Sequence, residues 1–180
     1  VIVNILFTTY LSLVNTALPI YFTNFAKIAP AAGSSFITLS ALFSWYIAFA
    51  ALCQLPIARW LNQFTRPRAL MISALVWAIG FLLVWVTGSL AHNTLLLAAL
   101  SVGVIAVATV SYTPAASALV AALAPEAMRG VYLSINSLCW AVGYFIGPTV
   151  GGWAMGQSVQ IAHAFWVAAA LTVIGAIGIL

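Results

Sequence analysis

The chain has 180 residues, of which 66% are hydrophobic and only 3% are charged, and its mean hydropathy is +1.21. Soluble domains carry charge on roughly a quarter of their residues, so this chain cannot surround an apolar core with a polar shell. The net charge of +4 comes from basic residues that are scattered between apolar runs, which argues against a nucleic acid partner. The composition therefore indicates an integral membrane protein whose solvent is the lipid bilayer.

Long apolar runs recur along the whole sequence. A bilayer core about 30 Å thick requires about 20 mostly apolar residues for each spanning helix. Six runs of this kind occupy 1–22, 35–58, 69–87, 94–122, 130–155 and 161–180. They are continuously apolar, whereas the strands of a membrane barrel alternate in polarity, so we predict an all-α domain of six helices. Because the first and last runs reach the ends of the sequence, we expect the chain to be a fragment of a longer protein.

The first run carries a polar face. Asn4, Thr8, Ser12 and Asn15 follow one side of a helix at intervals of three or four residues. An asparagine side chain inside lipid requires a hydrogen-bond partner. That partner could be another helix, a water molecule in a cavity or a substrate, and the sequence leaves these alternatives open.

The basic residues between the runs predict the orientation. Arg59, Arg66 and Arg68 lie between the second and third runs, and Arg129 lies between the fourth and fifth, whereas the opposite set of gaps holds Lys27 alone. Lys and Arg in short loops remain on the cytoplasmic side. We therefore expect these two arginine-containing gaps to face the cytoplasm, in a multi-pass protein of the plasma (inner) membrane.

The second and fourth runs offer weaker candidates for function. Trp45 and Gln54 lie on the second run, and Tyr112 lies on the fourth, two residues before Pro114. A proline inside a helix removes one backbone hydrogen bond and can kink the helix there.

The fifth run contains a row of glycines. Gly143, Gly147 and Gly151 recur every four residues, with Pro148 and Gly152 beside them. Small residues at this spacing let the backbone of a neighbouring helix approach closely. The row could serve only for helix packing, or it could be a hinge or gate at the point where the proline interrupts the backbone hydrogen bonds.

A second stripe runs along an adjoining face of the fifth run. Tyr132, Asn136, Trp140 and Tyr144 are also spaced by four. Tyrosine near the end of a span is typical of an interface anchor, which accounts for Tyr132. The three deeper residues could line a cavity or form hydrogen bonds between helices.

Several kinds of chemistry have little support in the sequence. No Asp or Glu lies in any predicted span, so the chain supplies no intramembrane carboxylate for a proton relay. Two distant histidines, His92 and His163, and the isolated Cys53 and Cys139 do not form a metal-binding pattern. We therefore predict no metal, no cofactor and no enzyme activity.

Two segments of the sequence resemble a known family. Residues 143–152 read GYFIGPTVGG, which matches the GxxxGPxxGG pattern of the fifth helix in half of a major facilitator superfamily transporter. The gap before that helix contains Glu126 and Arg129 and is similar to the family's usual approach to it, an acidic step followed by Arg-Gly and an aromatic residue. The resemblance covers the whole chain.

The gap between the second and third runs is a degenerate form of the family's other motif. Ala58, Asn62 and Thr65 stand where the family has Gly, Asp and Gly, while Arg66 and Arg68 remain. This erosion, and the absence of arginine from the fourth run, favour the carboxy-terminal six helices of a drug or metabolite antiporter-like member.

The resemblance implies an architecture and a function. Each half of such a transporter consists of two inverted three-helix repeats, and the substrate binds between the halves. The first and fourth runs would then face the cavity, and the second and fifth would contact the other half. The glycine row would be the surface against which the two halves rock. The residues expected at the cavity are Thr8, Asn15, Tyr112, Asn136, Trp140 and Tyr144.

We therefore expect secondary active transport of a small solute by alternating access, as in multidrug or metabolite efflux. The implied partners are a small-molecule substrate, the lipid bilayer and the other six-helix half of the same transporter. A channel-like or structural membrane subunit is the alternative, and an intramembrane enzyme is a more distant one.

Overall fold

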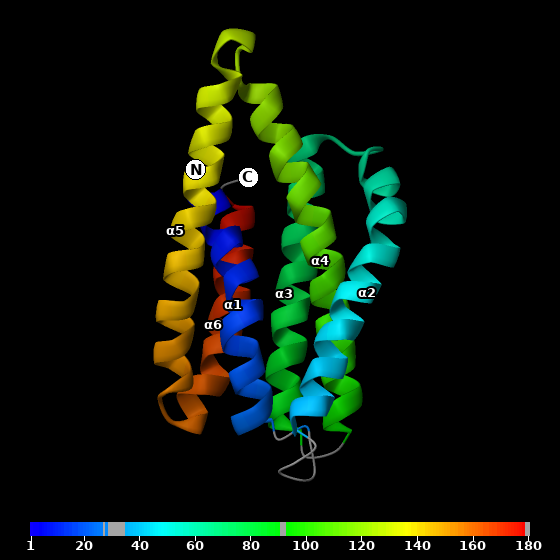
Figure 1. The fold of residues 1–180 in the computed structure, drawn as a ribbon, viewed down its shortest axis with the longest axis vertical. Helices are drawn as coiled ribbons and strands as arrows, with labels where there is room; N and C mark the ends of the chain where they lie inside the picture. The colour runs from blue at the N-terminus through cyan, green and yellow to red at the C-terminus, as the bar shows by residue number, and fades with distance from the viewer. Residues whose placement is uncertain (27, 29–34, 91–92, 179–180) are drawn as a thin grey trace.

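The protein is a bundle of six long helices (Figure 1). The computed structural model describes residues 1–26, 28, 35–90 and 93–178. The predicted loop residue Lys27 and the residue His92 lie outside these described residues. The helices are α1 (Ile2–Asn24), α2 (Ser35–Leu61), α3 (Arg66–Ser89), α4 (Thr94–Leu123), α5 (Arg129–Met155) and α6 (Val159–Ile177), with a 3₁₀ turn, η1 (Glu126–Met128), before α5. The described residues contain no β-strand.

Every long helix has the length and composition of a membrane span, and the shortest of them has 19 residues. The helix ends lie within three residues of the ranges that the sequence indicates. Shifts of three residues surround the gap between α2 and α3, which shortens to residues 62–65 because α2 continues to Leu61 and α3 already begins at Arg66. Pro67 permits this early start, since a proline in the first turn of a helix removes an N–H that has no partner within the helix.

The bundle consists of two three-helix units, α1–α3 and α4–α6, which pack into each other. α1 packs along α5, and α4 packs along α2, so the first helix of each three-helix unit contacts the middle helix of the other unit. α3 contacts both α4 and α6. These reciprocal contacts between the two units are expected for two inverted three-helix repeats.

The glycine row on α5 forms the contact with α1. Gly143, Gly147 and Gly151 are buried, and a Cβ atom on Gly143 would overlap the hydroxyl of Thr8 and lie 2.7 Å from the Thr9 backbone nitrogen. A Cβ on Gly147 would lie only 2.6 Å from the Ser12 Cβ. The row therefore faces α1 of the same chain, which corrects the expectation that it is the surface between the two transporter halves.

The remaining residues of that motif lie on other sides of α5. Pro148 is exposed, and a Cβ atom built on Gly152 would meet nothing within 4 Å. The motif thus has a packed side, formed by the row spaced by four, and an open side.

An aromatic cluster joins α1 to α3 and α6. The ring of Phe81 lies 5.2 Å from that of Tyr10, 5.3 Å from that of Trp77 and 5.7 Å from that of Trp166, and all four residues are at most 2% exposed. Aromatic rings bury large areas and fill the space that helices with bulky side chains leave between their backbones. The cluster therefore fixes the side of α1 that does not touch α5.

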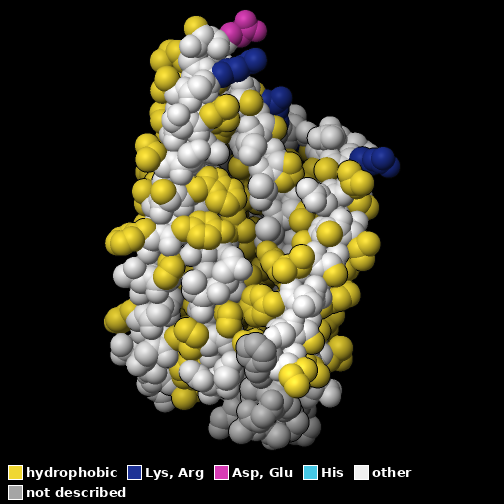
Figure 2. Space-filling model, in the orientation of Figure 1, with side chains coloured by type: hydrophobic (Ala, Val, Ile, Leu, Met, Phe, Trp, Pro, Cys, Tyr) yellow, Lys and Arg dark blue, Asp and Glu magenta, His cyan; other side chains and the backbone are white. Residues whose placement is uncertain are grey.

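The fixed charges of the described residues gather at one end of the bundle. Figure 1 shows that the α2–α3 gap and η1 lie at the same end, and Figure 2 shows basic and acidic side chains there. We call this the arginine end. Its charged residues are Arg59, Arg66, Arg68, Arg129 and Glu126. The sequence-based expectation is that this end faces the cytoplasm.

The α1–α5 contact can be tested with one added methyl group. Gly147→Ala should lower the midpoint of thermal unfolding of the purified protein, because the new Cβ meets the Ser12 Cβ and the Thr9 carbonyl oxygen rather than a flexible side-chain end. Overpacking of this kind costs about 1–3 kcal/mol. The matched control is Gly152→Ala on the open side of the same helix, which should leave the midpoint unchanged or raise it. Equal effects of the two substitutions would contradict the assignment.

Candidate functional site

A chain of hydrogen bonds joins α1, α4 and α5. The Tyr112 hydroxyl on α4 donates to the Asn4 side-chain oxygen on α1, and the Asn4 amide nitrogen donates to the Asn136 side-chain oxygen on α5 at 2.8 Å. Hydrogen bonds in series polarise one another, and each satisfies a polar group that lipid could not. We call Asn4, Tyr112 and Asn136 the polar triad.

The polar triad has a buried end and an open end. Tyr112 is 2% exposed, and its ring stacks on that of Phe7 with the centroids 4.5 Å apart. Asn136 is half-buried and uses its oxygen for Asn4, while none of the described residues accepts a hydrogen bond from its amide NH₂ group. The open end of the triad therefore presents hydrogen-bond donors.

Tyr132, Asn136, Trp140 and Tyr144, which we call the α5 stripe, follow one face of α5. Beyond Asn136 the stripe continues with two aromatic residues. Trp140 is half-buried and Tyr144 is 43% exposed, and their rings stack with the centroids 6.0 Å apart and the planes at 17°. Asn136, Trp140 and Tyr144 thus form a continuous face with hydrogen-bonding and aromatic groups, as their spacing indicates.

Thr8 and Tyr112 support this face without lining it. Thr8 is fully buried, and its hydroxyl donates to the Cys139 carbonyl oxygen on α5 at 3.0 Å. This bond is possible because the neighbouring Gly143 has no side chain to separate the two helices. The positions of both residues between helices differ from the expectation that they line the cavity.

Asn15 lies on an open side of α1. Its side chain is exposed, and its amide nitrogen donates to the Leu11 carbonyl oxygen of its own helix at 2.9 Å. α1 is otherwise well buried, so this exposed polar residue marks the side of α1 that neither α5 nor the aromatic cluster covers. Asn15 does not contact the polar triad through any described hydrogen bond.

The predicted loop residues lie away from the triad, at the arginine end. Asn62 and Arg66 line a separate cavity at this end of the bundle, which is not the expected substrate cavity. Arg68, Glu126 and Arg129 are exposed. The Arg66 guanidinium donates to the Ala118 carbonyl oxygen of α4 at 2.7 Å. Arg66 therefore connects α3 to α4 near the arginine end, whereas the triad connects helices within the span.

Two polar contacts were not anticipated from the sequence. Asn4 belongs to the polar face of the first run, but its central position between Tyr112 and Asn136 depends on which helices surround it. The second contact joins α2 to α4, where the Tyr46 hydroxyl donates to Thr109 at 3.1 Å. A tyrosine and a threonine in separate apolar runs carry no sequence signal that would pair them.

These six helices, each long and apolar enough to cross a bilayer, define an integral, multi-pass membrane protein. The family model described as Major Facilitator Superfamily matches residues 1–180, and the chain belongs to this superfamily of membrane transporters of small solutes. The family resemblance is thereby confirmed, and the bundle is half of the family's fold, made of two inverted three-helix repeats. No curated protein and no solved structure compared with the chain matches it.

The bond between Asn4 and Asn136 should be measurable as a coupling free energy. A double-mutant cycle of Asn4→Ala and Asn136→Ala on the free energy of unfolding should give a coupling of about 0.6 kcal/mol, the average for hydrogen bonds between membrane helices, and at most about 1.7 kcal/mol. In the control cycle, Ser137→Ala replaces Asn136→Ala. Ser137 is exposed and bonds only to the Leu133 carbonyl oxygen of its own helix, so additive effects are expected. A coupling no larger than that of the control cycle would rule out the bond.

Proposed function

We propose that this chain is the carboxy-terminal half of a secondary active transporter that moves a small solute by alternating access. The observation that carries the proposal is the exposure of amide side chains at Asn15 on α1 and, in part, at Asn136 on α5. Polar side chains in membrane helices normally face the interior of a bundle or a water-filled cavity. An open polar face on a family member is therefore best explained as one wall of the substrate cavity.

The distribution of burial supports a second half that covers this face. α2 and α5 are the least buried of the six spans. They present large apolar side chains such as Leu52 at 73% exposed and Phe145 at 75% exposed. In the proposed assembly, parts of these two helices contact the other six-helix half and the remainder faces lipid.

The chemistry of the cavity wall favours a small amphipathic solute. The wall offers amide N–H groups from Asn136 and aromatic surface from Trp140 and Tyr144. Such a wall recognises an aromatic or apolar body together with a few hydrogen-bonding groups. Efflux of a drug or metabolite of this kind is the proposed physiological task.

Coupling to an ion gradient would depend on the other half. Glu126, the only acidic residue of the chain, lies on η1 at the arginine end, before α5 begins. Proton-driven transporters use ionisable groups at membrane depth as relays. We propose that the coupling carboxylate lies outside this chain and that this half binds only neutral parts of the solute.

Solute counterflow in proteoliposomes tests the proposal. The complete protein, loaded with unlabelled chloramphenicol, should concentrate labelled chloramphenicol transiently, because a carrier exchanges its solute and a channel does not. Ethidium provides a cationic aromatic probe for the same assay. Asn15→Ala and Asn136→Ala should each reduce the initial rate about ten-fold, the effect of losing roughly 1.4 kcal/mol of binding to the transported solute.

Ser137→Ala is the matched control, because it removes a hydroxyl one position away from Asn136 on an exposed side of α5. Its rate should equal that of the unmodified protein. Non-saturable flux without counterflow would identify a channel and overturn the proposal. Normal rates for both asparagine variants would remove these residues from the cavity wall.

A further inference from the structure

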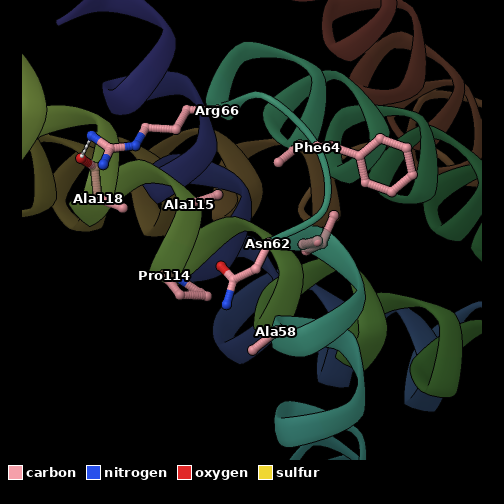
Figure 3. Close-up of a pocket in the computed structure, with 9 residues that line it drawn as sticks. Ala58, Asn62, Phe64, Arg66, Pro114, Ala115 and Ala118 are labelled. Atoms are coloured by element: carbon pink, nitrogen blue, oxygen red, sulfur yellow. Dashed lines mark hydrogen bonds between the residues drawn. The ribbon is translucent and has the colours of Figure 1, made fainter.

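A cavity lies at the arginine end, away from the polar triad. Figure 3 shows the α2–α3 gap on one side of this cavity and α4 on the other. Its volume is about 440 Å³, and its lining includes Asn62, Phe64, Arg66 and Pro114. Small-molecule sites have volumes of about 300–1,000 Å³, so the cavity is large enough to hold a polar group.

The guanidinium of Arg66 lines the cavity and is hydrogen-bonded to α4. One of its nitrogens, Nη1, donates to the Ala118 carbonyl oxygen at 2.7 Å (Figure 3). A guanidinium has five N–H groups in one plane, so this bond orients the plane and leaves further donors available. Asn62 provides an amide side chain at another part of the lining. The polar groups of the cavity thus include several hydrogen-bond donors.

The electrostatics of this cavity favour an anion. Arg66 and Arg68 lie in the first turn of α3, where the helix dipole is positive, and that turn contains no acidic residue. Basic side chains at a helix N-terminus are unfavourable unless a negative charge is near them. Glu126, the only acidic residue of the chain, belongs to η1 at the other connection and does not line the cavity.

The cavity also lies at the depth where lipid headgroups are expected. Trp60, near the end of α2, and Phe64, in the gap after it, are 48% and 37% exposed, and their rings lie edge to face with the centroids 5.0 Å apart. Exposed aromatic residues at the end of a membrane span are typical of the boundary between hydrocarbon and headgroups. Since Phe64 lines the cavity, an anion bound there would be at the level of the phosphates.

We propose that this cavity binds the phosphate group of an anionic phospholipid, with Arg66 as the charged donor and Asn62 as a neutral donor. Arginine binds phosphate oxygens through two parallel N–H groups, which gives both orientation and strength. Binding would place a negative charge beside the first turn of α3. The site is independent of the proposed transport function.

Lipid retention by the purified protein tests this site. The complete protein is equilibrated with equal amounts of phosphatidylglycerol and phosphatidylcholine in detergent, and the bound lipids are counted by native mass spectrometry. Phosphatidylglycerol should be retained preferentially. Arg66→Gln should reduce that retention roughly ten-fold, because it removes a charged hydrogen-bond donor. Arg59→Gln removes the same charge from a residue that does not line the cavity, and it should reduce retention clearly less.

A second variant separates binding from folding. Asn62→Leu leaves the bond between Arg66 and Ala118 in place and makes the lining apolar, so it should also reduce phosphatidylglycerol retention while preserving the unfolding midpoint. Equal losses for Arg66→Gln and Arg59→Gln would indicate general surface charge and overturn the site. Displacement of phosphatidylglycerol by an equal concentration of inorganic phosphate would overturn the lipid assignment, because a free anion would then fill the cavity as well.

Discussion

The close approach of α1 and α5 is the contact on which the rest of the structure depends. Gly143, Gly147 and Gly151 remove side chains from one side of α5, so the α1 backbone can lie directly against it. In lipid there is little hydrophobic force to bring helices together, and close packing of small residues takes its place. The same approach brings the Thr8 hydroxyl within reach of the Cys139 carbonyl oxygen and aligns Asn4 with Asn136.

While one side of α1 packs against α5, its other sides contact different helices. Tyr10 enters the aromatic cluster with α3 and α6, and Asn4 reaches Tyr112 on α4. Asn15 remains exposed, on a side of α1 that neither α5 nor the aromatic cluster covers. α1 is therefore the most buried span, yet it also carries the exposed polar residue Asn15. This combination fits a helix that lines the proposed substrate cavity.

The neutral polar side chains and the charged side chains of the chain lie in different parts of the bundle. Within the spans, the polar triad and the α5 stripe offer amide, hydroxyl and aromatic groups. The four arginines and Glu126 lie at one end of the bundle. Neutral hydrogen-bonding groups can be satisfied inside lipid by partner helices, whereas fixed charges require water or headgroups. This separation explains why the proposed solute-binding face and the proposed phosphate site lie in different parts of the bundle.

The sequence by itself determined the number of spans, the helical class and the family, because apolar run length and the GxxxGPxxGG spacing depend only on local order. It also determined which residues share a face, such as Asn136, Trp140 and Tyr144. Only the tertiary structure decided what each face meets. The glycine row meets α1 of the same chain, Thr8 and Tyr112 lie between helices, and Asn4 joins two residues more than 100 positions away. Helical periodicity specifies the direction of a side chain around its own axis, but the neighbour it contacts depends on how all six helices pack together.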